Sequence, residues 1–94
     1  MTYKLVFKEE ALREWKKLDA TVRDIFRKKL KERIEEPRIE SARVSGMADC
    51  YKIKLRRAGY RLVYQVRENE LVVSVVAVGK RERNQIYKAA IKRI

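Results

Sequence analysis

The chain contains no histidine, a single cysteine and no long hydrophobic run, and these absences exclude several kinds of protein. Cys50 alone cannot form an internal disulfide, and without histidine the chain lacks the usual ligands of a zinc site. No segment approaches the ~20 apolar residues of a membrane span, and the N-terminal apolar run is too short and too charged for a signal peptide. We therefore expect a cytoplasmic protein with no metal, no other cofactor and no membrane partner.

What the chain has in excess is positive charge, and this charge is unevenly distributed. The 25 Lys+Arg residues against 13 Asp+Glu give a net charge of +12. Residues 1–49 hold 13 basic and 10 acidic side chains, whereas residues 50–94 hold 12 basic and only 3 acidic. Such concentration in one half indicates a surface that binds a polyanion. A membrane would instead favour a basic helix with a broad apolar face, and most of these charges fall on expected strands and turns.

The first half of the chain is expected to form one strand and two helices. Residues 3–8 alternate in a pattern typical of a short strand. Apolar side chains then recur at helical spacing over residues 11–18 and again over residues 22–34. The second helix should stop before Pro37, since the residue preceding a proline disfavours helical backbone. The two helices are predicted to pack as an antiparallel hairpin.

The second half is expected to form three strands and a short helix after a loop over residues 37–49. The strands are Cys50–Arg56, Tyr60–Arg67 and Leu71–Val78, with turns at Ala58-Gly59 and Glu68-Asn69. The third strand is nearly all apolar, so it should be central and covered on both faces, and Gly79 should end the sheet. The C-terminal helix is marked by Ile86, Tyr87, Ala90, Ile91 and Ile94.

This order, βααβββα, predicts a single α+β domain over residues 1–94. A small sheet of about four strands would pack on the α-helical hairpin, with the short C-terminal helix added.

Strand parity gathers cations on one face of the predicted sheet. In the first strand after the loop, Lys52, Lys54 and Arg56 point to the face opposite the apolar side chains. If Ala58-Gly59 is a two-residue turn, Arg56 lies opposite Arg61, and Lys54 is diagonal to Arg61 on the same face. A change of one residue in the loop would send Arg61 to the other face.

A second basic group lies where the last strand meets the C-terminal helix. Lys80, Arg81 and Arg83 are close in sequence there, and Tyr87 is one helical turn beyond Arg83. A basic patch with an aromatic ring at its rim suits a phosphodiester and a stacked base. We identify Lys80, Arg83 and the strand residue Arg56 as candidate RNA-binding residues. On spacing alone, the pattern favours a place for Tyr87 in the core of an amphipathic helix over a contact with the base.

Crowded like charges also allow catalysis. Repulsion from neighbouring cations lowers the pKa of a central lysine, because it disfavours the protonated form. A lysine so affected can act as a general base near neutral pH, as histidine does in many ribonucleases, while arginines clamp phosphate oxygens. A basic strand face by itself more often marks simple binding of nucleic acid, so a non-enzymatic binder remains an alternative.

Three sequence motifs narrow these alternatives. They are residues 46–56 (GMADCYKIKLR), residues 59–66 (GYRLVYQV) and residues 78–83 (VGKRER). With these motifs, the chain resembles over essentially its whole length the RelE toxins of bacterial toxin–antitoxin pairs, a branch of the RelE/ParE superfamily.

The resemblance implies a ribosome-dependent endoribonuclease that cleaves mRNA in the ribosomal A site by attack of a ribose 2′-hydroxyl on the adjacent phosphate. Lys52 and Lys54 match the lysines that activate this hydroxyl and steady the developing charge, and which of them is the base stays open. Arg61 matches an arginine that stabilises the transition state. Arg81 matches one at the leaving oxygen, where charge stabilisation is chemically easier than proton donation. Tyr87 matches the tyrosine that stacks on the mRNA base.

The resemblance also implies partners. These are a cognate RelB-like antitoxin, the ribosome at its A site and 16S rRNA, mRNA, and operator DNA reached only through the antitoxin. The alternative within the superfamily is a ParE-like toxin that poisons gyrase. That branch lacks the paired strand lysines and the arginine–tyrosine set, so the five residues Lys52, Lys54, Arg61, Arg81 and Tyr87 argue against it.

Overall fold

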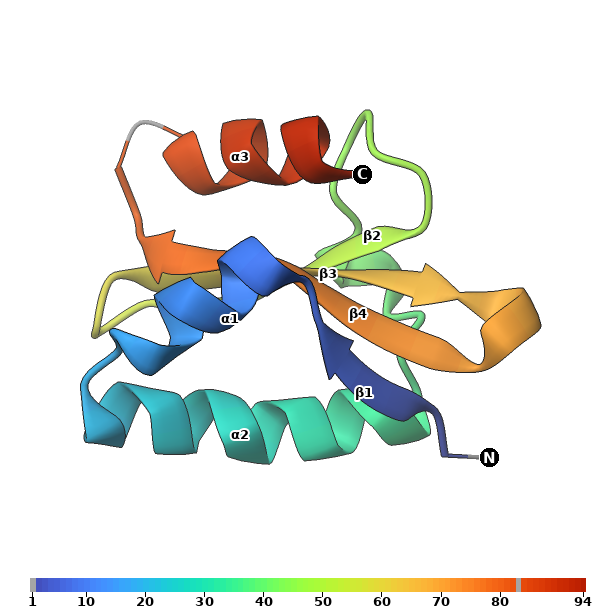
Figure 1. Ribbon diagram of the computed structural model, residues 1–94, viewed down its shortest axis with the longest axis horizontal. Coiled ribbons are helices and arrows are strands. Elements are labelled where there is room, and N and C mark those ends of the chain that lie inside the picture. The colour runs from blue at the N-terminus through green and yellow to red at the C-terminus, as the bar shows by residue number, and fades with distance from the viewer. Residues whose placement is uncertain (1, 83) are drawn as a thin grey trace.

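The computed structural model describes residues 2–82 and 84–94, and it has the predicted order of elements (Figure 1). The strands and helices are β1 (Lys4–Phe7), α1 (Glu9–Lys16), α2 (Ala20–Glu35), β2 (Cys50–Leu55), β3 (Tyr60–Arg67), β4 (Val72–Lys80) and α3 (Gln85–Arg93). Two 3-10 turns, η1 (Glu40–Ala42) and η2 (Glu68–Glu70), lie in the connections. The βααβββα prediction is therefore confirmed.

The four strands form one sheet in the order β1-β4-β3-β2. β1 runs parallel to β4, and the other neighbours are antiparallel. β4 is central, as predicted, and its residues 73–78 are all buried. The expectation that Gly79 ends the sheet is wrong. β4 continues because Gly79 pairs with Arg61 and Lys80 pairs with Tyr60.

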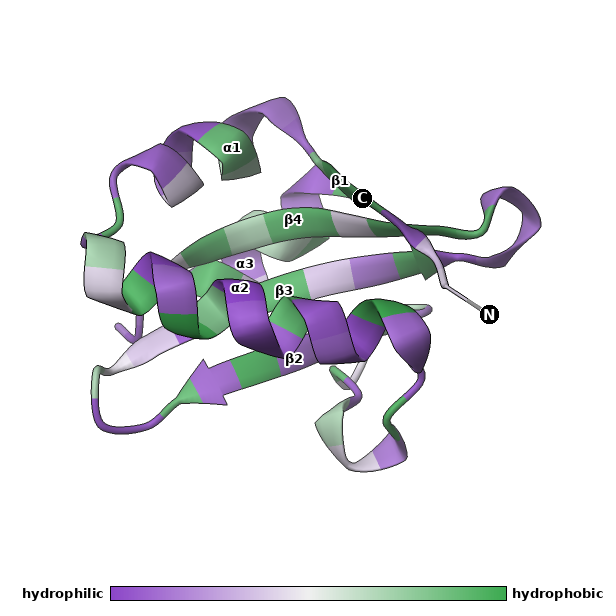
Figure 2. Ribbon diagram, turned by 90° about the horizontal axis from the view of Figure 1, so that it is seen from below, coloured by the Kyte–Doolittle hydropathy of each residue, from purple (hydrophilic) through white to green (hydrophobic). Residues whose placement is uncertain are grey.

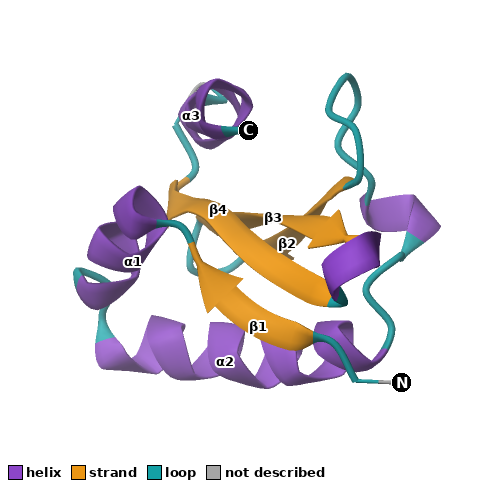
Figure 3. Ribbon diagram, turned by 45° about the vertical axis from the view of Figure 1, so that its right-hand side comes forward, coloured by secondary structure: helices purple, strands orange, loops and turns teal. Residues whose placement is uncertain are grey.

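Helices cover the two faces of the sheet unequally (Figure 3). α1 and α2 pack on one face, where the main core holds Trp15, Phe26 and Leu30 from the helices beside Ile53 and Tyr64 from the strands. The chain reverses direction between α1 and α2, as a helical hairpin requires (Figure 1). Figure 2 shows that β4 is hydrophobic over most of its length, whereas α2 has many hydrophilic residues.

The other face of the sheet carries a smaller core, which α3 covers only in part. This core contains Val63, Val76 and Ala77 from the strands together with Ile86 and Ala90 from α3. Gly79 allows the close approach of α3, because a Cβ placed there would lie 2.9 Å from Cδ1 of Ile86. No helix in the described part of the chain is long and apolar enough to span a membrane.

A bulge interrupts the pairing of β3 with β4. Val63 pairs with Ala77, but the next residue, Tyr64, pairs with Val75, so that Val76 is the extra residue. Val76 and Ala77 consequently both belong to the smaller core on the α3 side. The bulge bends β4 at the point where its neighbour β1 has already ended at Phe7.

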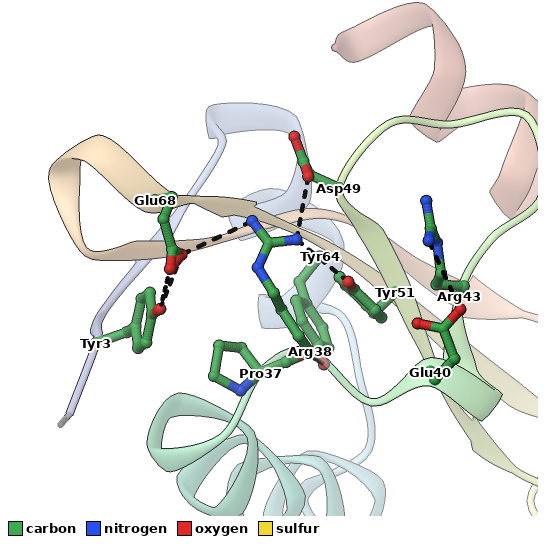
Figure 4. A network of polar contacts seen from close by, with 9 residues as sticks. All are labelled: Tyr3, Pro37, Arg38, Glu40, Arg43, Asp49, Tyr51, Tyr64 and Glu68. Atoms are coloured by element: carbon green, nitrogen blue, oxygen red, sulfur yellow. Dashed lines mark hydrogen bonds and ion pairs between the residues drawn. The ribbon is translucent and has the colours of Figure 1, made fainter.

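The segment between α2 and β2 is fixed to the sheet by a network of polar contacts (Figure 4). The Arg38 guanidinium donates hydrogen bonds to Asp49 at 3.1 Å and to the Tyr51 hydroxyl at 3.3 Å. It also pairs with Glu68 at 3.7 Å, and Glu68 accepts a hydrogen bond from the Tyr3 hydroxyl at 2.7 Å. This predicted loop is thus an anchored segment, and Val44 and Met47 in its middle are buried in the smaller core.

Candidate active site

The β2–β3 hairpin places two cations directly opposite each other. Leu55 pairs with Tyr60, so the connecting loop is Arg56–Gly59, and Lys54 pairs with Arg61. The predicted two-residue turn is therefore wrong, and so is the diagonal placement of Lys54. The shared face is nevertheless correct, because the real loop is longer by an even number of residues and strand side chains alternate with a period of two.

These cations face an open cleft of about 550 Å³ between the sheet and α3. Lys52 and Lys54 come from β2, Arg61 from β3 and Tyr87 from α3. Residues 44–47 of the anchored segment also line it. Four of the five residues predicted to be catalytic are therefore brought together on one concave surface. The structure assembles them from three elements that are distant in sequence.

Electrostatic repulsion in the cleft falls mainly on Lys54. Its pKa is lowered first by Lys52 and next by Arg61, with smaller contributions from burial, Arg56 and Arg81. All four of these neighbours are cations, so the protonated form of Lys54 is disfavoured. The expected effect on a central lysine is present, and Lys54 is the lysine that shows it.

Tyr87 lies between the smaller core and the cleft. Its ring packs against the core cluster on the α3 face, and it is half-buried while lining the cleft. The pKa of its phenol is raised, because the effect of burial exceeds the opposing effect of the nearby Arg61. The core and cleft interpretations of Tyr87 therefore both describe part of its surroundings.

Arg81, Arg56 and Lys80 do not line this cleft. Arg81 is exposed after β4, where its backbone N–H donates to the Gly59 carbonyl at 2.7 Å and fixes it beside the β2–β3 loop. Arg56 is exposed in that same loop, so its placement on the strand face is corrected. Lys80 pairs with Tyr60, whose ring packs on the α1–α2 side, and it therefore points away from Lys54. Arg83 lies outside the described residues.

Two contributors to the site were missed from the sequence. Arg33 of α2 donates hydrogen bonds to the Lys52 carbonyl at 3.1 Å and to the buried Tyr64 hydroxyl at 2.9 Å, so it holds the backbone of a site lysine. Lys88 adds a further cation to the cleft beside Asn84 and Ile91. Positions 84, 88 and 91 share one helical face, and this spacing could have revealed Lys88. Nothing in the sequence marks Arg33.

Metal-ligating groups do not gather in the described part of the chain: no group of three or more His, Cys, Asp or Glu side chains there could hold a metal ion. Cys50 is buried, and burial raises the pKa of its thiol to about 11. A thiol held in its protonated form is a poor nucleophile, so the reactive groups of the cleft are its amines, the Arg61 guanidinium and the Tyr87 phenol.

Comparisons with known proteins agree with this geometry. A family model described as the ParE toxin of the type II toxin-antitoxin system parDE matches residues 5–85. The mRNA interferase toxin RelE of Escherichia coli K12 is 58% identical over 94 residues, which cover 100% of this chain and 99% of that protein. The mRNA interferase RelE of Shigella flexneri has the same identity and coverage.

Solved structures give the same result. A mutant of E. coli toxin RelE in the free state superposes with a TM-score of 0.93 at 56% identity, covering 100% of this chain and 99% of that one. The toxin in the intact E. coli RelBE complex gives a TM-score of 0.83 at 59% identity, covering 86% and 99%. Fold and site thus define a toxin of the type II toxin–antitoxin class. Within that class, the chain belongs to the RelE family.

Proposed function

We propose that this protein is an endoribonuclease that cleaves mRNA in the A site of the ribosome and so stops translation. The observation that carries the proposal is the direct pairing of Lys54 with Arg61 in a cleft that Tyr87 borders. This arrangement provides a base of lowered pKa, a fixed positive charge and an aromatic surface next to one another. The relatives named mRNA interferase support the same activity.

In the proposed step, the neutral amine of Lys54 removes the proton from a ribose 2′-hydroxyl, and the 2′-oxygen attacks the adjacent phosphorus. The bond from phosphorus to the 5′-oxygen breaks, which leaves a 2′,3′-cyclic phosphate and a 5′-hydroxyl. Lys52 and Arg61 stabilise the negative charge on the phosphate oxygens. Arg81 stabilises the leaving oxygen, which takes its proton from water, because a guanidinium does not give up a proton readily.

Substrate orientation falls to the remaining residues. Tyr87 offers an aromatic face on which a base of the codon can stack. Arg56 and Lys80, which lie outside the cleft, would add only long-range attraction for RNA. We assign the same supporting contribution to Arg83 from its place in the sequence. The ribosome would complete the orientation of the substrate, because it would hold the message and 16S rRNA against the basic face.

The proposed partners follow from the family. The E. coli relative has been solved in the RelBE toxin-antitoxin complex and with a peptide of the antitoxin RelB. We propose that a cognate RelB-like antitoxin neutralises this toxin in the cytoplasm, and that operator DNA is reached only through it.

The direct test is cleavage of a message on programmed ribosomes by the purified protein. We expect cuts within the A-site codon, with a cyclic phosphate on one product, and almost no cleavage of the same RNA without ribosomes. Lys54→Ala should lower the single-turnover rate by a factor of about 100 or more, since a general base contributes about 10²–10⁴-fold. Lys28→Ala, an exposed change on α2, is the matched control and should cleave normally.

Three outcomes would contradict the proposal. Inhibition of gyrase with intact mRNA would favour the ParE-like alternative, and RNA binding without cleavage would favour a simple basic binder. Full activity of Lys54→Ala on ribosomes would place the chemistry elsewhere.

A further inference from the structure

The last helix, α3, supplies Tyr87 to the cleft but has few apolar contacts of its own. Ile86 and Ala90 are its buried residues, with 9% and 0% of their surfaces exposed. Ile91 and Ile94 are 55% and 44% exposed. Tyr87 and Ala89 also pack against the smaller core but stay partly exposed, so a nine-residue helix with only two buried side chains gains little from hydrophobic packing. Its position over the sheet therefore depends on additional contacts.

A charged pair between Glu14 of α1 and Arg93 of α3 provides such contacts. Nη1 of Arg93 lies 2.8 Å from Oε1 of Glu14, and Nη2 lies 3.1 Å from Oε2, which is the two-pronged geometry of a strong arginine–carboxylate pair. The side chains are only 18% and 31% exposed, whereas every other ion pair among the described residues is more exposed on both sides.

The same two side chains also bind the edge of β4. Nη1 of Arg93 donates to the Val76 carbonyl at 3.0 Å, and Oε1 of Glu14 accepts from the Val78 N–H at 3.2 Å. The Val76 carbonyl belongs to the bulge and the Val78 N–H follows it, at an edge of β4 that no longer pairs with β1. The pair therefore completes the hydrogen bonding of a strand edge while connecting it to α1 and to the C-terminal end of α3. We call Glu14 and Arg93 the α3 clasp.

We propose that the α3 clasp positions Tyr87 for RNA cleavage, with Glu14 and Arg93 acting as positioning residues that do not contact the substrate. Ile86 fixes the start of α3 near Gly79, and Arg93 fixes its end at Val76. Tyr87 lies between these two points on the side of the cleft. Releasing one end lets α3 pivot, and a displacement of about 1 Å can reduce a rate by up to about 100-fold.

This inference rests on the proposed function, and double variants with Tyr87 separate it from a general loss of stability. Arg93→Met should lower the single-turnover rate on programmed ribosomes about tenfold or more, and Arg93→Lys, which keeps one donor, should recover part of the loss. In a Tyr87→Ala background, Arg93→Met should have almost no further effect, because residues that act through one another are not additive. Glu9→Gln, which removes the exposed Glu9–Arg13 pair of α1, should stay within about twofold of the wild-type rate.

Amide hydrogen exchange, which needs no ribosomes, tests the α3 clasp separately from the proposed cleavage of mRNA. Amide hydrogen exchange over residues 87–90 should become faster in Arg93→Met and in Glu14→Gln, while exchange in β3 stays at the wild-type rate. Unchanged exchange in α3, or an Arg93→Met loss that persists in full without Tyr87, would overturn the α3 clasp. If the wild-type protein does not cleave, the proposed activity fails, and the exchange result still decides whether the clasp holds α3.

Discussion

At the scale of single residues, the chemistry of the site depends on which cations are direct neighbours. Strand alternation predicted that Lys52 and Lys54 share a face, and an assumed two-residue turn placed Arg61 on it as well. The structure has all three on that face. The sequence did not predict that Lys54 and Arg61 are direct partners, because the hairpin loop is Arg56–Gly59 and not a two-residue turn. Local sequence specifies parity, whereas register depends on how the whole hairpin packs.

Arg33 illustrates a contact that no local pattern reveals. It reaches from α2 to the Lys52 carbonyl and to the Tyr64 hydroxyl, which in turn donates to the Pro37 carbonyl at 2.7 Å. Helix, loop and strand are joined at this point through one buried phenol. The connection arises from tertiary packing, so a one-dimensional pattern carries no sign of it.

Removal of this phenol should destabilise the protein. Tyr64→Phe deletes an acceptor for Arg33 and a donor to Pro37, which should lower the free energy of unfolding by about 1–3 kcal/mol. Urea denaturation measures the change. Tyr60→Phe, on the same strand and only partly buried, is the control and should cost less. Equal stability of the two variants would show that the Tyr64 hydroxyl contributes nothing.

At the scale of elements, the sequence pattern predicted the order and type of the strands and α-helices, but not the 3-10 turns η1 and η2. The failures are at ends, where pairing partners decide the outcome. β4 runs past Gly79 because Arg61 and Tyr60 extend the ladder. That extension directs Lys80 toward the α1–α2 side and removes it from the group of site cations. Gly79 lies within the strand, and because it has no side chain, Ile86 of α3 can pack close to it.

The close approach at Gly79 makes a specific prediction about α3. Gly79→Ala places a Cβ 2.9 Å from Cδ1 of Ile86, and such overpacking should cost about 1 kcal/mol or more. Ile86→Val removes that Cδ1, so the double variant should be more stable than the sum of the single effects predicts. A double-mutant cycle by urea denaturation measures the coupling. Simple additivity would contradict the contact.

At the scale of the whole molecule, part of the charge of residues 50–94 gathers in one cleft, which Lys52, Lys54, Arg61 and Lys88 line. The cleft unites cations of β2, β3 and α3, while much of the helical charge of the first half lies on the opposite side of the sheet. Composition predicted a polyanion surface, and strand parity predicted its centre. Neither indicated that α3 would form a wall of the cleft, because the docking of a short helix is decided by long-range contacts such as the α3 clasp.

Binding of RNA should accordingly depend on salt through the cations of the cleft. The affinity for a non-cleavable 2′-O-methyl oligonucleotide should fall linearly on a plot of log K against log salt concentration. Lys88→Gln should make the slope shallower by about 0.7, the value for one phosphate contact of a single strand. Lys28→Gln, on the far side of the sheet, should leave the slope unchanged. Fluorescence anisotropy makes the comparison, and equal slopes for both variants would place the RNA elsewhere.

The central claim is that crowded cations turn Lys54 into a base that works without histidine. The most direct test is the pH dependence of single-turnover cleavage on programmed ribosomes. A base acts when it is unprotonated, so the rate should rise with pH and level off near the pKa of Lys54, which its neighbours hold below the ordinary lysine value. Lys52→Gln removes the largest repulsion, raises that pKa and should shift the levelling to higher pH. An unchanged profile, or a shift to lower pH, would contradict the account.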